Sequence, residues 1–188
     1  MSKLDTDIKT ITRHLVEKQG EFDSVMDLVR NTIRNSAHAI TMLHNNDKKG
    51  AEKAIAAAKK MMEELHKFPS FEYQSKQAYQ EYAEAFIFFR IKQYDEIPIY
   101  SSVGIDHESY LMGLMDVIGE LKREILESLR ENNADDAEEY FKHMCNIYDS
   151  TRSIRFAEAV LNGFRKKQDV ARIQLESAGS EILSFKRR

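Results

Sequence analysis

Two pairs of acidic residues have spacings that place each pair on one face of a helix. Glu81 and Glu84 are three residues apart, and Asp116 and Glu120 are four apart. Side chains at these spacings are neighbours on a helix surface. Most acidic pairs belong to a solvated helix face, but these two adjoin the strongly apolar segments AFIFF and LMGLM. Carboxylates in such surroundings need a partner, because removing a charge from water is costly.

The sequence leaves two kinds of partner open for these carboxylates. One is a divalent cation, because carboxylate oxygens are hard ligands that suit Mg²⁺ or Mn²⁺. The other is a set of ion pairs with Arg90, Lys122 and Arg123. Glycines at positions 113 and 119 flank the second acidic pair, and each destabilises a helix interior by about 1 kcal/mol relative to alanine. A close approach by a backbone or a ligand would explain their presence.

Basic residues form three groups that are candidates for binding nucleic-acid phosphates. The net charge of -3 shows that any phosphate-binding surface must be local, since the chain as a whole is not basic. A solvated helix face is the alternative interpretation of each group. The candidates are Arg30 and Arg34 in the first expected helix, Lys122 and Arg123 just after the second acidic pair, and Arg165, Lys166 and Lys167 near the start of the last expected helix.

Apolar residues recur at three- and four-residue steps through most of the chain, which predicts helices and no strands. Gly20 is expected to kink or divide the first helix, and residues 98–104 are expected to form a loop. Short connections between helices favour a single antiparallel all-α bundle of six or seven helices, spanning residues 1–188 as one domain. The expected helices cover residues 6–44, 48–67, 72–94, 107–130, 134–149, 154–161 and 164–184.

The composition agrees with a helical protein and excludes several functional classes. Seven glycines and two prolines are few, and charged residues make up 31% of the chain. The single cysteine, Cys145, allows no internal disulfide, and neither a signal peptide nor a membrane span is evident, so we expect a soluble cytoplasmic protein. No P-loop, dinucleotide fingerprint, nucleophile elbow or zinc-binding pattern is present. In the expected helices 72–94 and 107–130, apolar residues cover more than one face. This predicts that the two helices lie at the centre of the bundle or at a subunit interface.

Four segments resemble the translin family in order and spacing. They are VRNTIRNSAHAITMLH, YQEYAEAFIFF, YLMGLMDVIGELKREILESL and NGFRKKQDVARIQLES, and the likeness extends over residues 23–177. In particular, QEYAEA and GLMDVIGEL resemble the translin-associated factor X branch of the family. That resemblance implies a seven-helix bundle that assembles into a hollow octamer and processes RNA inside it. It also implies that Glu81, Glu84, Asp116 and Glu120 are catalytic acids, which translin itself lacks.

The resulting hypothesis is a metal-dependent endoribonuclease that cleaves single-stranded RNA inside a homo-oligomeric, octameric shell. Mg²⁺ or Mn²⁺ is the expected cofactor, with Glu84 and Asp116 as direct ligands. Glu81 and Glu120 would act as further ligands, as supports for the ligands, or as general base. Two alternatives stay open: a non-catalytic binder of single-stranded RNA or DNA of the translin type, and a helical scaffold for a protein partner. A translin-type partner subunit is an alternative to assembly from one kind of chain.

Overall fold

The computed structural model describes residues 2–187, and these residues form helices without strands. None of the helices in this range combines the length and the apolar composition that crossing a membrane requires. The helices are α1 (Lys3–His44), α2 (Lys48–Leu65), the 3₁₀ turn η1 (Pro69–Phe71), α3 (Glu72–Tyr94), α4 (Tyr100–Val103), α5 (His107–Arg130), α6 (Ala134–Thr151) and α7 (Phe164–Lys186).

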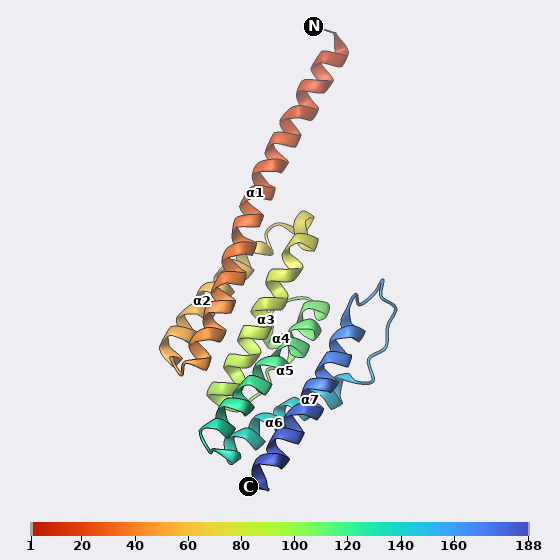
Figure 1. Cartoon of the computed structure of the whole chain (residues 1–188). Coiled ribbons are helices and arrows are strands. Elements are labelled where there is room, and N and C mark those ends of the chain that lie inside the picture. The colour runs from red at the N-terminus through yellow and green to blue at the C-terminus, as the bar shows by residue number, and fades with distance from the viewer. Residues whose placement is uncertain (1, 188) are drawn as a thin grey trace.

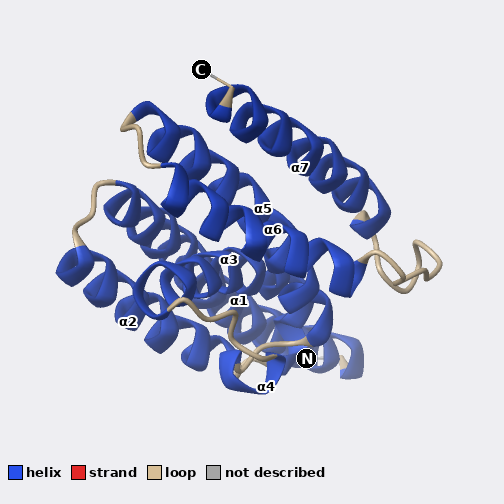
Figure 2. Cartoon of the chain, turned by 90° about the horizontal axis from the view of Figure 1, so that it is seen from below, coloured by secondary structure: helices blue, strands red, loops and turns tan. Residues whose placement is uncertain are grey.

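The helices are stacked in layers, with α3 and α5 in the middle (Figures 1 and 2). Helices α1 and α2 pack against one side of α3, and α6 and α7 pack against α5. Side chains such as Phe88 of α3 and Ile118 of α5 are fully buried in the common core. The apolar surplus predicted for these two segments is therefore explained by their central place in the bundle. The N-terminal part of α1 projects beyond the other helices as a free arm (Figure 1).

Helices α3 and α5 run parallel, which departs from the expected antiparallel arrangement. Lys76 of α3 pairs with Glu108 of α5, and Lys92 pairs with Glu124, so the offset between partners is 32 residues at both ends. The connection 95–106, which includes α4, carries the chain back along the bundle. It must return over about 28 Å of helix, and 12 residues reach about 40 Å when extended. Because of this parallel register, Glu81 and Glu84 of α3 lie beside Asp116, the first residue of the second acidic pair.

Gly113 lies at a tight contact between α3 and α5. A Cβ atom at this position would lie 2.6 Å from the Cβ of Ala83, 3.0 Å from the backbone nitrogen of Glu84 and 3.1 Å from the backbone oxygen of Gln80. Any larger residue would push the two helices apart. The close approach predicted from the sequence is thus confirmed at Gly113, and the approaching group is the backbone of α3. At Gly119 a Cβ would make only ordinary contact, at 3.5 Å from Gln174.

Three local predictions about secondary structure differ from the structure. Gly20 does not divide α1, since the helix is continuous from Lys3 to His44. The expected loop 98–104 contains the one-turn helix α4. The expected helix 154–161 is a series of turns and bends, because Leu161 is its only buried residue and no apolar stripe faces the core. The boundaries of α5 agree with the prediction, and Asp106 caps it by accepting the backbone N–H of Ser109 at 2.9 Å.

The two glycines of α5 provide a matched test of this packing. Replacing Gly113 by alanine is expected to lower the free energy of unfolding by about 1–3 kcal/mol, because the added methyl overlaps α3. Replacing Gly119 by alanine is expected to leave stability unchanged or raise it by up to about 1 kcal/mol, since alanine favours the helix and has room. Urea unfolding measures both. Equal effects of the two substitutions would contradict the close contact at Gly113.

Candidate functional site

Asp116 lies where α3, α5 and α7 meet, and it has a partner from each neighbouring helix. Lys167 of α7 forms an ion pair with its Oδ1 atom. Gln80 of α3 donates from Nε2 to its Oδ2 atom at 2.7 Å. Asp116 and Lys167 are each about a quarter exposed, so the pair is open to solvent on one side. That open side forms a groove between α5 and α7, which Lys166 also lines.

The carboxylates of Glu81 and Glu84 lie close enough to Asp116 to change each other's protonation. Burial raises the pKa of Glu84 to about 8, and the charges of Asp116, Glu81 and Glu120 add to that effect, while Lys167 opposes it. Burial and then Asp116 also raise the pKa of Glu81. Neither glutamate has a hydrogen-bond or ion-pair partner within residues 2–187. The structure thus brings all four predicted acids into one electrostatically coupled group.

Glu120 is held by a histidine from the end of α1. Nε2 of His44 lies 2.5 Å from Glu120, and Nδ1 of the same ring lies 2.5 Å from Glu124. Lys92 of α3 binds the other oxygen of Glu124 at 2.8 Å and also donates to the backbone oxygen of Leu43 at 2.9 Å. The side chains of His44, Glu124 and Lys92 are all at least nine-tenths buried. This charged network ties α1, α3 and α5 together next to the acidic group.

The protonation of this network follows from its geometry. Burial by itself lowers the pKa of His44, but hydrogen bonds and charges from Glu120 and Glu124 outweigh that effect, so the pKa is raised. Burial likewise favours the neutral form of Glu124, and His44 and Lys92 outweigh it, so the pKa of that carboxyl is lowered. The network therefore sets two basic side chains, His44 and Lys92, against two acidic ones, Glu120 and Glu124. Such a balanced set costs less to bury than any of its charges alone.

The acidic group offers the right atoms for a divalent cation but does not hold them in a ligand arrangement. Among residues 2–187, no three His, Cys, Asp or Glu side chains converge as metal ligands do. Two of the four carboxylates are engaged by cations of the protein itself, Asp116 by Lys167 and Glu120 by His44. The donor set nevertheless fits Mg²⁺ or Mn²⁺, because it is made of carboxylate oxygens and the half-buried Glu84 has no ion-pair partner within residues 2–187.

The predicted basic residues are divided between this site and other surfaces. Lys166 and Lys167 line the groove beside Asp116, and Arg165 is exposed on the preceding turn of α7. Arg123 is exposed and Lys122 half-buried on α5, three and two residues beyond Glu120. On α1, Arg30 pairs with Asp27 at 2.5 Å and Arg34 donates to Asn31 at 2.6 Å, so both bind within their own helix. The ion pairs considered for Arg90, Lys122 and Arg123 with the acidic group are not formed, and Arg90 pairs with Glu96 instead.

Several residues of the site were not predicted from the sequence. Gln80 and Lys92 contact the acidic residues from α3, and His44 reaches them from the end of α1. Glu124 follows Glu120 by four residues on the same face of α5, in the same apolar surroundings, and this spacing was the available signal. His44 carried no such signal, because it contacts residues that are 76 and 80 positions away in the chain.

Solved structures with the same arrangement of helices identify the class of protein. The chain superposes on AfC3PO with a TM-score of 0.85 and 25% identity, covering 96% of this chain and 97% of that one. A complex of AfC3PO with duplex RNA gives 0.86, with 24% identity and 96% of each chain covered. Apo-NeC3PO gives 0.82, with 24% identity and 98% of each chain covered. The fold is therefore the C3PO/translin fold.

The chain shares its fold with the C3PO/translin structures, and sequence similarity gives it a family relative as well. This relative is the uncharacterized protein MJ0175 of Methanocaldococcus jannaschii, which is 32% identical over 184 residues. That match covers 95% of this chain and 82% of MJ0175, so the two proteins are members of one family. No family model matches the chain.

The raised pKa of Glu84 predicts how stability depends on pH. Between about pH 5 and pH 8 the folded carboxyl keeps a proton that the unfolded chain releases, so stability falls as the pH rises. Glu84→Gln removes this dependence and is expected to stabilise the protein at pH 8 by about 3 kcal/mol more than at pH 5. Thermal unfolding at the two pH values measures the difference. Glu63→Gln, at an exposed carboxylate, is the control, and parallel pH profiles for wild type and Glu84→Gln would contradict the assignment.

Proposed function

We propose that the protein is a metal-dependent endoribonuclease that cleaves single-stranded RNA, as in the translin-associated factor X branch of its family. The observation that carries this proposal is the coupled group of four carboxylates between α3 and α5, with Glu84 half-buried and unpartnered among them. A purely structural role does not account for Glu84, because a carboxyl that is partly removed from water without a partner destabilises the fold. The resemblance of QEYAEA and GLMDVIGEL to that branch points to the same residues.

Mg²⁺ or Mn²⁺ would supply a Lewis acid that polarises the scissile phosphate and activates water near neutral pH. Glu84 and Asp116 are the proposed direct ligands, since Glu84 lacks a partner and Asp116 faces the groove. Glu120 is fixed by His44 and is suited to support the others. Glu81 is half-buried with a raised pKa and is suited to accept a proton as general base.

Lys167 has a special place in this proposal because it already acts as the cation of the acidic group. Its ammonium pairs with Asp116 and partly opposes the rise in the pKa of Glu81 and of Glu84 that burial causes. A divalent cation at Asp116 would release this ammonium toward the groove, where Lys166 also lies. Both lysines would then bind phosphates of the RNA backbone, together with Arg165 at the same helix end. Lys122, Arg123, Arg30 and Arg34 would extend the phosphate-binding surface outside the groove.

One observation favours the second candidate, a non-catalytic binder of single-stranded RNA or DNA. The acidic side chains do not converge as metal ligands, and Lys167 neutralises Asp116. A groove of this kind can receive a nucleic-acid strand without cutting it. One C3PO neighbour is a complex with duplex RNA, so both single-stranded and duplex RNA belong in any test.

The projecting arm of α1 supports assembly into a homo-oligomer, which the family resemblance implies to be an octamer. Leu4, Ile8, Ile11 and Leu15 repeat at steps of four and three residues, and each is more than half exposed. Residues 22, 25, 29, 32, 36, 39 and 43 continue the same repeat where α1 packs on its own bundle. A lone helix of about 20 residues with an exposed apolar stripe is marginal in water, so the arm is expected to pack on another subunit. We propose a second copy of this chain rather than a translin-type subunit as that partner.

Glu84→Gln is the variant that tests the nuclease proposal most simply. Labelled single-stranded and duplex RNA are incubated with protein and with Mg²⁺, Mn²⁺ or chelator. Wild type is expected to cleave only with metal, and Glu84→Gln is expected to cleave at least about 100-fold more slowly. Glu63→Gln is expected to match wild type, because this carboxylate lies on the exposed face of α2.

Each other outcome of that experiment has a defined meaning. Binding without cleavage in any metal would favour the non-catalytic binder. Absence of both binding and cleavage at low salt would favour a protein scaffold. Metal-dependent cleavage that Glu84→Gln leaves intact would show that the nuclease site lies elsewhere.

The arm predicts a specific effect on assembly. Replacing Ile8 and Ile11 together by aspartate is expected to lower the mass measured by light scattering, because charges on the stripe prevent burial. Replacing Thr10, on the opposite face of the arm, by aspartate is expected to leave the mass unchanged. A monomeric wild-type protein, or an unchanged mass for the Ile8 and Ile11 variant, would contradict the role of the arm.

A further inference from the structure

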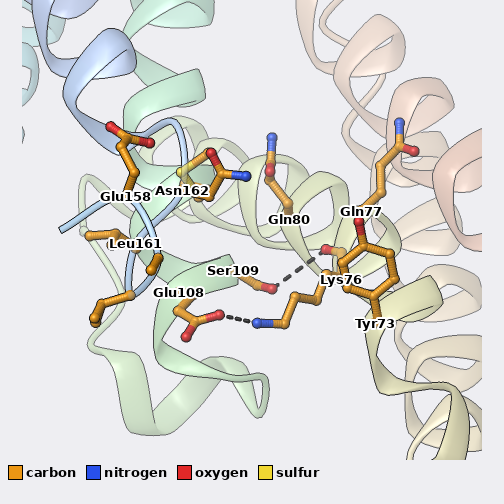
Figure 3. Close-up of a pocket in the computed structure, with 12 residues that line it drawn as sticks. Tyr73, Lys76, Gln77, Gln80, Glu108, Ser109, Glu158, Leu161 and Asn162 are labelled. Atoms are coloured by element: carbon orange, nitrogen blue, oxygen red, sulfur yellow. Dashed lines mark hydrogen bonds and ion pairs between the residues drawn. The ribbon is translucent and has the colours of Figure 1, made fainter. Parts of the chain in front are cut away.

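A second hollow lies next to the acidic group, between α3, α5 and the irregular segment 152–163 (Figure 3). Its volume of about 480 Å³ is within the range of small-molecule sites. Tyr73 and Gln77 line it from α3, and Asn162 lines it from the irregular segment. Met112 and Leu161 supply apolar surface. The hollow thus combines an aromatic ring, amide side chains and an apolar floor.

The charged side chains in this hollow are already paired. Lys76 forms an ion pair with Glu108, as the dashed line in Figure 3 shows. Glu158 accepts the backbone N–H of Gly163 at 2.7 Å, which closes the turn before α7. Because each charge has a partner, the hollow offers no free cation to a phosphate among the residues that line it.

The uncharged polar groups, in contrast, are available. The side-chain amides of Gln77 and Asn162 have no hydrogen-bond partner within residues 2–187. Tyr73 is 84% exposed, and its ring packs on no other aromatic ring in the described chain. A ligand that matches these groups is planar, uncharged and rich in hydrogen-bond donors and acceptors. A nucleobase has these properties, since bases stack on aromatic side chains and pair with amides along their edges.

The hollow adjoins the acidic group and the groove through two residues. Gln80 lines the hollow and donates to Asp116, which lines the groove between α5 and α7. Met112 lines both the hollow and the groove. A strand whose phosphate reached Asp116 would therefore place a neighbouring nucleotide at the hollow.

We propose that this hollow is a nucleobase subsite for the bound RNA strand. Tyr73 stacks on the base, and Gln77 and Asn162 hydrogen-bond its edge. The inference rests on the proposed function for the identity of the ligand, and it assigns a role to residues outside the carboxylate group. The subsite fixes one nucleotide beside the acids and so sets the register of the strand.

Binding of labelled single-stranded RNA in chelator tests the subsite without any cleavage. Tyr73→Ala is expected to weaken binding by about 5- to 100-fold, and Tyr73→Phe is expected to retain it, because the ring remains. Asn162→Ala is expected to weaken binding by about 2- to 10-fold. Tyr94→Ala, at an exposed tyrosine outside the hollow, is the matched control. An otherwise identical abasic strand, which keeps the phosphates, is expected to bind wild type and Tyr73→Ala equally.

The outcomes separate this inference from the proposed nuclease. Equal affinity of wild type and Tyr73→Ala for RNA with bases would overturn the subsite, even if wild type cleaves RNA with metal. An equal loss for the abasic strand would also overturn it, because the ring would not be recognising a base. Tyr73-dependent binding of the base-containing strand in a protein that never cleaves would support the subsite and overturn the nuclease. No RNA binding by wild type would overturn both.

Discussion

The structure depends on one electrostatic constraint: four carboxylates are crowded at the place where α3 and α5 touch. The parallel register of the two helices puts the acidic pairs side by side, and Gly113 allows the backbones to approach. Like charges at this distance repel, so the bundle must supply positive charge nearby. It does so with Lys167 from α7, which pairs with Asp116, and His44 from α1, which pairs with Glu120. The outer helices are thereby tied to the central pair by charge as well as by apolar packing.

Lys167 and His44 offset only part of the negative charge of the four carboxylates, and the part that is not offset suggests a function. Burial raises the pKa of Glu84 to about 8, the neighbouring carboxylates add to this rise, and Lys167 offsets only part of it. A protein selected only for stability would replace such a residue, whereas a site for a divalent cation requires it. The network of His44, Lys92, Glu120 and Glu124 is balanced and buried, so it holds one edge of the acidic group rigid. Asp116, Lys167 and Gln80 form the other edge, which opens to the groove and to the neighbouring hollow.

Much of this arrangement could be predicted from the sequence, and the exceptions have physical reasons. The period of apolar residues located the long helices, and Asp106 marked the start of α5. The helix expected at 154–161 failed because local propensity was not supported by an apolar stripe. The short connections between the other helices predict antiparallel neighbours. They carry no information on α3 and α5, which the longer segment 95–106 joins in parallel. The four acids were identified by spacing and context, but their partners were not, since His44 and Lys167 come from distant segments that only the folded bundle brings close.

The most direct test of the account is whether the carboxylate group binds a divalent cation. Electron paramagnetic resonance of free Mn²⁺ during a titration of the protein measures binding without any RNA. The account predicts saturable binding to wild type that is lost in Asp116→Asn and in Glu84→Gln and is retained in Glu63→Gln. Binding that these two substitutions leave unchanged, or no saturable binding to wild type, would contradict it.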